Sequence, residues 1–334
     1  MNIKITAKNI TPLAQIESDK KGKENNITAI TIKTLTKIIN DIPTDIPVYT
    51  ANGFRGLLRR IASDIVCEKA KQKGIKISTT DFHLMYAGGG NNFQDQSVDV
   101  EDRVRELNPV ISLFGTSLAV EGKLALTHLE PVNPLIKIYE NENGIYANSQ
   151  LIKKIVMIKK DDVLDHSPSA MKILSKEDVK KWEEFAKENQ EERAKERNSE
   201  KDKEDKTKKE TIKHIFAKYY LIPNTEMQGF IGVKTGFNLT DTEKGLLIET
   251  LKRLGKFPLG STQNLGFGLM EYLISLNDED RIVIKRKDNI FLDEVEEDII
   301  DDELIKAKKA FDKFLENLSE ENIAVSKVLV KKEK

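Results

Sequence analysis

Two arginines at the start of an expected helix are the residues whose type and spacing best suit chemistry. The segment NGFRGLLRR begins at Asn52, a residue type favoured at helix N-caps. Arg55 and Arg59 are four residues apart and therefore share one helix face, with about 5–6 Å between their Cβ atoms. Guanidinium groups beside glycine-exposed helix amides suit an anion such as a phosphate. Ordinary surface ion pairs with Asp64 or Glu68 explain the pattern equally well.

A glycine-rich stretch, GSTQNLGFG at residues 260–268, is the second candidate and contains Gln263 and Asn264. It is not a P-loop, because no Gly-Lys-Ser or Gly-Lys-Thr follows. It is not a dinucleotide-binding fingerprint either, because it leads into an expected strand and not into a helix. Its glycines permit close approach of another backbone or of a ligand's phosphates. A tight turn that packs against a sheet is the favoured interpretation.

Four lysines flank an apolar strand that is expected over residues 150–161: Lys153, Lys154, Lys159 and Lys160. They could form a track for phosphates. Lysines at an edge strand also prevent unwanted strand pairing, so both interpretations stay open. The run GGGNN at residues 88–92 is expected to be a plain linker.

No known catalytic pattern occurs in the sequence. It contains no Gly-x-Ser-x-Gly elbow and no His-Glu-x-x-His pair. The single cysteine, Cys67, excludes an internal disulfide and a cysteine-based zinc site, and its apolar neighbours predict an inert core thiol. The four histidines are far apart along the chain. We therefore expect a protein that is not an enzyme and that needs no cofactor.

The overall charge is balanced, with 54 Lys+Arg against 55 Asp+Glu. This balance averages unlike parts, because residues 293–303 are mostly acidic while basic residues gather at 55–60 and 153–160. A net charge of -1 therefore does not exclude a local nucleic-acid-binding surface. No apolar run reaches about 18 residues, which excludes a membrane-spanning helix. The N-terminus lacks the apolar stretch of a secretory signal, so a cytoplasmic protein is expected.

Hydrophobic periodicity predicts the elements that must position these residues. Strands are expected at 2–8, 27–35, 123–132, 150–161, 230–239 and 269–275, and helices at 52–73, 81–86, 241–254 and 304–318. Asn52 and Asp241 are the expected N-caps of two of these helices, and Gly74 ends the first. Residues 17–26 are expected to be a mobile loop and residues 43–47 a turn between prolines. Residues 188–213 carry nine acids and nine bases, which predicts a solvated helix or a disordered insertion.

This order of elements predicts an α+β fold with a modified RRM-like or ferredoxin-like core. The core is expected to comprise residues 1–74, 109–152 and 224–276. A helical insertion is expected at 75–108, a second insertion at 153–223, and an acidic C-terminal helical extension at 277–334.

Three short motifs, taken in order, resemble the repeat-associated mysterious protein superfamily of CRISPR systems. They are the helix start GFRGLLRR after Pro47-Val48-Tyr49, the Leu113-Phe114-Gly115 turn, and the closing loop with Gly266-Phe267-Gly268. Residues 52–59 follow the register that this superfamily shows at its helix start. The length, residues 160–162 and the large insertion resemble the Cas seven backbone subunit, in particular its type IV version.

The resemblance implies a subunit that binds CRISPR RNA and polymerises with copies of itself in a helical filament, alongside other CRISPR effector subunits. The filament would present the guide for pairing with a target nucleic acid. No membrane partner is implied. The core would be the palm, residues 75–108 the finger and residues 153–223 the thumb. The implied RNA-binding residues are Asn52, Arg55, Arg59, Arg60, Lys153, Lys154, Lys159, Lys160, Gln263 and Asn264. Because guide bases must stay free to pair, contacts to phosphates and to shape should dominate.

One departure from the superfamily bears on activity. Type III relatives that cut target RNA carry a catalytic Asp in a glycine-rich loop after the first strand. The corresponding residues 26–29 here contain no acid, and Asp19, upstream in a lysine-rich stretch, is a poor candidate. The leading hypothesis is therefore a non-cleaving RNA-binding subunit. The alternatives are a type III-like metal-dependent endoribonuclease and a protein-interaction scaffold that recruits partners through its acidic tail and charged insertion.

Overall fold

The computed structural model describes residues 1–24, 27–89, 93, 96–116, 119–142, 144–160, 175, 177, 180–181, 184, 213–277, 279–286, 294–298 and 302–330. These residues belong to two compact units. The first comprises Met1–Asp19, Thr31–Lys153 and Tyr219–Lys334, and the second comprises Lys20–Ile30 and Lys154–Lys218. The expected charged segment 188–213 lies outside the described residues except for residue 213, and so do residues 90–92 of the GGGNN run.

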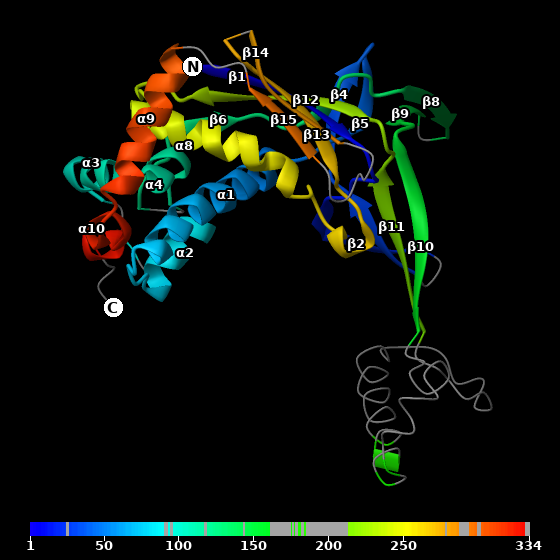
Figure 1. Ribbon diagram of the computed structural model, residues 1–334. Helices are drawn as coiled ribbons and strands as arrows, with labels where there is room; N and C mark the ends of the chain where they lie inside the picture. Colours follow the sequence, from blue (N-terminus) through cyan, green and yellow to red (C-terminus); the bar gives the residue numbers. More distant parts are fainter. Residues whose placement is uncertain are drawn as a thin grey trace. The chain divides into compact units, whose positions relative to one another are not determined.

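The main sheet of the first unit runs in the order β15-β14-β13-β1-β12-β6, and β7 also pairs with β12 (Figure 1). Strand β1 is antiparallel to both of its neighbours, with Ile5 opposite Gly229 of β12 and Ile274 of β13. The strands of this sheet are β1 (Asn2–Asn9), β6 (Leu124–Leu126), β7 (Glu130–Pro131), β12 (Glu226–Val233), β13 (Met270–Leu276), β14 (Glu279–Arg286) and β15 (Glu294–Asp298).

Helix α1 follows β1 after an insertion of strands, and α8 connects β12 to β13. The order β13-β1-β12-β6, with helices after the first and third of these strands along the chain, is that of a ferredoxin-like or RRM-like β-α-β-β-α-β core. The predicted fold class is confirmed. The helices are α1 (Ala51–Gln72), α2 (Thr79–Ala87), α3 (Val98–Leu107), α4 (Pro109–Phe114), α8 (Asp241–Lys252), α9 (Asp302–Glu316) and α10 (Glu320–Ile323), with short 3-10 turns η1 (Arg253–Lys256), η2 (Gln263–Leu265) and η3 (Val325–Lys327).

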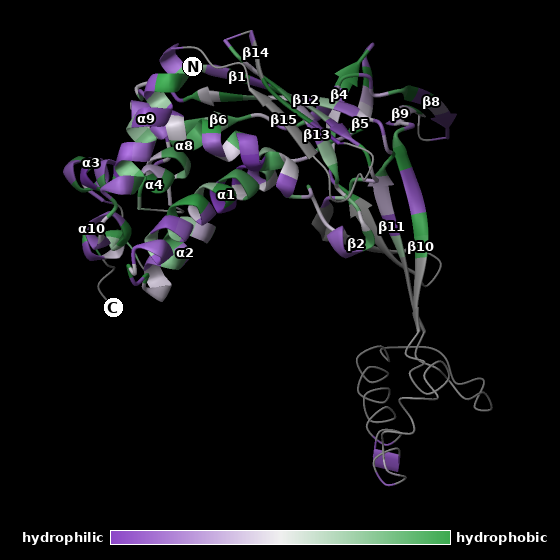
Figure 2. Cartoon of the chain, in the orientation of Figure 1, coloured by the Kyte–Doolittle hydropathy of each residue, from purple (hydrophilic) through white to green (hydrophobic). Residues whose placement is uncertain are grey.

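The apolar stripe predicted for α1 is the face that the helix buries. Leu58, Ile61 and Val66 are fully buried, and so are Ile3 and Ile5 of β1. Apolar and polar residues accordingly occupy different sides of α1 and α8 (Figure 2). Burial of each large apolar side chain contributes about 1.5–3 kcal/mol, so this stripe fixes the orientation of the helix and of its polar residues.

Two smaller sheets complete the described chain. One has the order β10-β11-β3-β2, and its strands are β2 (Ile16–Glu24), β3 (Ile27–Ile32), β10 (Ile152–Lys160) and β11 (Lys213–Leu221). The other has the order β4-β5-β9-β8 and lies within the first unit; its strands are β4 (Thr34–Ile39), β5 (Ile42–Pro47), β8 (Ile136–Asn141) and β9 (Gly144–Ser149).

Two expected irregular segments are strands. Residues 17–26 were expected to form a loop, but residues 16–24 form β2, because pairing of the backbone does not require an apolar pattern at the end of a sheet. The turn expected at Pro43 to Pro47 is wrong as well. The chain turns earlier, at Asn40 and Asp41, whose φ angles of 50° and 63° suit a two-residue hairpin loop. Both prolines lie in β5. They are on the face of the strand opposite to that of Ile42, which pairs with Ile39 next to the hairpin loop.

Helix ends and lengths also differ from expectation. Thr50, and not Asn52, caps α1, and Thr240, and not Asp241, caps α8 in a capping box with Glu243. The charged residues before Asn108 form the helix α3. Strands β8, β9, β11, β14 and β15 were not predicted, and the single strand expected at 123–132 is divided into β6 and β7.

Candidate anion-binding site

The N-terminus of α1 is held by side chains from two other segments. The Thr50 hydroxyl accepts the Gly53 amide N–H at 3.2 Å, and the Thr50 amide donates to Gln15 Oε1 at 2.7 Å. The Ala51 amide donates to Nδ1 of His128 at 2.9 Å. These amides are therefore already bonded within the chain. The part of the hypothesis that placed an anion on a glycine-exposed amide is not supported at Gly53, whose N–H is bonded to Thr50.

His128 reaches α1 because its strand leaves the main sheet. Between β6 and β7 the backbone of Leu129 exchanges hydrogen bonds with Tyr49 instead of with β12. Gly229 of β12 permits this crossing, since a Cβ there would lie 2.9 Å from the carbonyl oxygen of His128. The break in the expected strand thus positions His128 to accept the Ala51 amide N–H at the start of α1.

Arg55 and Arg59 point together at the C-terminal end of α4. Nη2 of Arg55 donates to the Phe114 carbonyl at 3.0 Å, and Nη2 of Arg59 donates to the same carbonyl and to that of Gly115 at 2.9 Å. The last carbonyls of a helix lack partners within the helix, so the two guanidinium groups satisfy them. The predicted shared face is confirmed.

The ion pairs considered for these arginines are not formed. Asp64 accepts the hydroxyl of Tyr86, and Glu68 pairs with Arg253 at 3.1 Å. Among the described residues, no carboxylate lies within 4 Å of either guanidinium group of Arg55 and Arg59. The alternative interpretation by these two surface pairs is therefore wrong.

The electrostatics of the pair follow from burial and from like charge. Burial lowers the pKa of Arg55, and the charge of Glu121 partly offsets this. Burial and, to a smaller extent, the neighbouring charge of Arg55 together lower the pKa of Arg59 to about 10. Two partly desolvated positive charges thus lie side by side with only carbonyl dipoles as partners. An anion between them would offset both the burial of the two charges and the repulsion between them.

These arginines line an open cleft of about 720 Å³. Two acids of the cleft are already paired, Glu121 with Lys234 at 2.7 Å and Glu101 with Arg105. The positive charges without a carboxylate partner are therefore those of the two arginines. The lining residues are Asn52, Arg55, Arg59, Glu101, Phe114, Thr116, Ala119, Val120, Glu121, Gly122 and Lys234.

The floor of the cleft requires two glycines. Gly115 has a φ of 72°, which favours glycine, and it lies against Gly122. A Cβ on Gly122 would lie 2.4 Å from the Phe114 carbonyl carbon and 2.7 Å from Nη2 of Arg55. The Leu113-Phe114-Gly115 turn singled out in the sequence therefore contacts both arginines, which donate to the carbonyls of Phe114 and Gly115.

Gly122→Ala is expected to lower the free energy of unfolding by about 1–3 kcal/mol, because backbone and guanidinium must both move to admit the methyl group. Urea denaturation measures this loss. Gly232→Ala is the matched control, since nothing lies within 4 Å of a Cβ at that position. Equal stability of the two variants would contradict the close approach.

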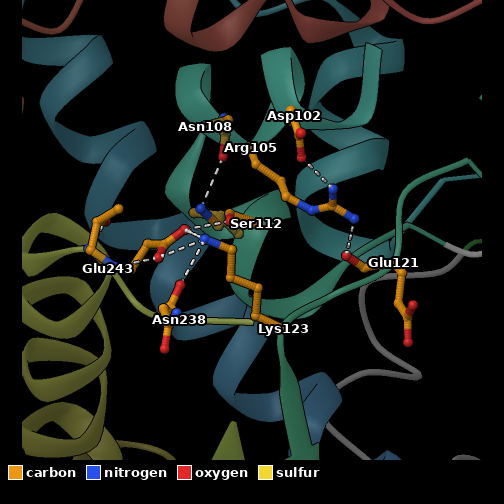
Figure 3. Close-up of polar contacts among 10 residues, drawn as sticks. Asp102, Arg105, Asn108, Ser112, Glu121, Lys123, Asn238 and Glu243 are labelled. Carbon is orange, nitrogen blue, oxygen red and sulfur yellow. Dashed lines mark hydrogen bonds and ion pairs between the residues drawn. The ribbon is translucent and has the colours of Figure 1, made fainter. Parts of the chain in front are cut away.

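A buried ion pair joins Lys123, the residue after Gly122, to Glu243 of α8 (Figure 3). Nζ of Lys123 lies 2.8 and 3.0 Å from the two carboxylate oxygens of Glu243, whose side chain is 3% exposed. Ser112 donates its hydroxyl to the same carboxylate, and the Thr240 amide donates to it at 2.8 Å. This network joins α4, the segment before β6, and α8, and so holds neighbouring Gly122 in place.

Arg60 and the glycine-rich loop form a second group. Burial raises the pKa of Tyr49, while a hydrogen bond with the Gly260 backbone and the charge of the exposed Arg60 lower it. The loop is tied to the segment after β1 through the Ser261 amide, which donates to the Ala14 carbonyl at 2.7 Å. The packed turn favoured from sequence is thus what the structure shows.

The remaining candidates are spread over the chain. Gln263 donates to the carbonyls of Pro258 and Gly260, and Asn264 is exposed beside it. The four lysines lie on β10, where Lys153 and Lys154 are exposed; the side chains of Lys159 and Lys160 lie outside the description. Their role in RNA binding stays a prediction. The pKa of the half-buried Cys67 is raised to about 11 by burial, which agrees with the expected inert thiol.

Sequence reasoning missed the residues that complete the cleft. Gly122 carried a weak signal, because it follows Gly115 closely in a short apolar stretch. Lys234 and Glu121 carried none, because their pairing joins residues 113 positions apart. Within the described part of the chain, no group of three or more His, Cys, Asp or Glu is arranged to hold a metal ion, and no helix is long and apolar enough to cross a membrane.

Comparisons with known proteins found matches among solved structures only. No protein-family model and no curated protein matches the sequence. Among solved structures 150 chains match, and one is a chain of a structure titled "Type IV-B CRISPR Complex". That match has a TM-score of 0.49 and 14% sequence identity, and it covers 83% of this chain and 91% of the other.

Proposed function

We propose that this chain is a structural subunit of a CRISPR ribonucleoprotein that binds guide RNA through its phosphates, assembles along it and does not cleave. The observation that carries the proposal is the pair Arg55 and Arg59, two adjacent guanidinium groups that open onto a cleft without a carboxylate partner among the described residues. The sequence motifs that resemble the repeat-associated superfamily contribute these residues and the turn beneath them.

The chemistry of the pair favours a phosphate backbone over a small neutral ligand. Each guanidinium uses Nη2 on a carbonyl and has a buried Nε, so its remaining Nη donors and its charge are what it can offer to an oxyanion. The cleft is open and polar, as a polymer requires. Contacts of this kind carry no base information, so the bases of a bound guide stay free to pair.

Arg60 extends the basic surface along α1. It lies 100° around the helix from Arg59, toward Tyr49 and the glycine-rich loop. Gln263 and Asn264 are on the exposed side of that loop. A strand of RNA that crosses the start of α1 would therefore meet Arg55 and Arg59 on one side and Arg60 on the other.

The proposal of a non-cleaving subunit rests on sequence. Residues 26–29 lack an acid, and Asp19 belongs to β2, a regular strand and not a glycine-rich loop. Metal-assisted cleavage needs carboxylates positioned at the scissile phosphate, and residues 26–29 supply none.

The nucleic acid that co-purifies with the full chain tests the proposal. We expect RNA of one guide length, or a ladder of regular steps, which survives nuclease treatment because the protein covers it. Addition of Mg²⁺ and a complementary target RNA is expected to leave the target intact. Recovery of no nucleic acid would favour the interaction scaffold, and cleavage that Asp19→Ala abolishes would establish the endoribonuclease.

A further inference from the structure

The sheet β4-β5-β9-β8 carries an unbroken apolar row on one face. Ile38 lies opposite Pro43, and Tyr146 lies opposite Tyr139. Thr44 pairs with Ala147 in parallel register, so Pro43 lies next to Tyr146. Since alternate residues of a strand point to opposite faces, all four side chains are on the same face, one from each strand.

This row is open to solvent. Ile38 is 68% exposed and Tyr146 40% exposed, and Pro43 is exposed as well. The rings of Tyr139 and Tyr146 stack with centroids 5.2 Å apart and an interplanar angle of 12°, which gives the row a flat aromatic end. A contiguous apolar row of this kind, flanked by polar residues, is typical of a surface that another protein covers.

The adjacent row is polar, and its charges are arranged asymmetrically. It contains Thr36, Asp45, Asn148 and Lys137, one from each strand, and all are exposed. Thr36 donates its hydroxyl to Asp45 at 2.7 Å, and Nζ of Lys137 lies 5.4 Å from the centre of the Tyr139 ring. The acid and the base thus lie on opposite sides of the middle of the sheet.

We propose that this face binds the same face of a second copy of the chain. A two-fold axis in the interface, parallel to the strands, reverses the strand order and keeps the rows aligned. Ile38 of one copy then lies over the stacked tyrosines of the other. Lys137 of each copy comes beside Asp45 of its partner, so one arrangement buries both apolar rows and forms two ion pairs.

The charges of the face disfavour the other obvious occupant, RNA. Asp45 lies in the polar row and Asp41 in the adjoining hairpin turn, and both would repel phosphates. The surface shares no residue with the arginine cleft. The pairing of two copies therefore goes beyond the proposed RNA binding and does not rest on it.

Sedimentation of the full chain, stripped of nucleic acid at high salt, tests the pairing. We expect a species of twice the 37.9 kDa chain mass that dissociates on dilution. Ile38→Glu and the double variant Ile38→Glu, Tyr146→Glu are expected to raise the dissociation constant roughly 10-fold or more. Ile138→Glu is the matched control, because Ile138 is 58% exposed on the opposite face of the same sheet. A monomer at all concentrations, a dimer lost when nucleic acid is removed, or a dimer broken by Ile138→Glu alone would overturn the proposal.

A charge exchange tests the arrangement itself. Asp45→Lys and Lys137→Glu are each expected to weaken the dimer, and the double variant is expected to restore it, because both inter-copy ion pairs form again with reversed sign. Failure of the double variant to dimerise better than either single variant would overturn the two-fold arrangement. RNA affinity of the same variants, measured by fluorescence anisotropy, is expected to be unchanged, which separates failure of the pairing from failure of the proposed function.

Discussion

Lys123→Met is expected to lower the free energy of unfolding by about 3–5 kcal/mol, the cost of leaving a buried charge without its partner. Glu243 is 3% exposed and would keep only the Ser112 hydroxyl and the Thr240 backbone amide as donors. Methionine fills nearly the volume of the lysine side chain, so the loss reports the charge and not a cavity. Urea denaturation followed by circular dichroism measures it.

Two further variants make this result specific. The double variant Lys123→Met, Glu243→Gln removes both charges. The amide oxygen can still accept the Thr240 N–H, and the amide NH2 can donate to the Ser112 hydroxyl, so most of the stability is expected to return. Lys306→Met removes a lysine from an exposed pair with Asp241 at 2.8 Å and should cost about 0–1 kcal/mol. Equal losses for Lys123→Met and Lys306→Met would contradict a buried network that holds α4, β6 and α8 together.

Replacement of Arg55 and Arg59 by glutamine is expected to weaken binding of single-stranded RNA about 100-fold, roughly 10-fold for each lost charge-assisted contact. The loss should be the same for unrelated RNA sequences, because phosphates are alike in all of them. Addition of Arg60→Gln should weaken binding further. Filter binding with two unrelated RNAs of equal length measures the effect.

The controls for this prediction address folding and charge separately. Arg103→Gln removes an arginine whose side chain is 49% exposed on α3, where it pairs with Glu106 and Glu321, and it should leave RNA affinity unchanged. Lysine at positions 55 and 59 keeps the charge without the planar fork and should give intermediate affinity. Because both arginines also bond the α4 carbonyls, the thermal unfolding midpoint of each variant must be compared with that of the unaltered protein. This comparison separates a loss of binding from a loss of stability. Selective loss for one RNA sequence would indicate base recognition and contradict the account.

The core could be predicted from the sequence because its elements have a clear apolar period. Ile3, Ile5 and Ala7 alternate in β1, and the stripe of α1 recurs at three and four residues, as the structure confirms. β2 could not be predicted in this way, since its pairing depends on the backbone of β3 and not on its own side chains. The Asn40–Asp41 turn and the Thr240–Glu243 capping box did carry local signals in their residue types. The prolines and Asp241 were the wrong residues from which to predict the turn and the N-cap.

The site could be predicted only in part, for a different physical reason. The spacing of Arg55 and Arg59 is local, so their common face follows from helix geometry alone. Their partners, the carbonyls of Phe114 and Gly115, come from more than 50 residues away and depend on how α4 packs. The same holds for His128, whose Nδ1 accepts the Ala51 amide N–H only because its strand leaves β12. Tertiary packing thus decides which of the expected hydrogen-bond donors are already bonded within the chain.

The salt dependence of RNA binding tests the central claim most directly. For single-stranded RNA the slope of log affinity against log salt concentration is about -0.7 per phosphate contact, so several contacts should give a steep slope. The Arg55→Gln, Arg59→Gln variant should show a slope shallower than that of the unaltered protein by about 1.4, two contacts' worth. A slope that these substitutions leave unchanged, or a flat dependence for the unaltered protein, would contradict a phosphate-binding role for the arginine cleft.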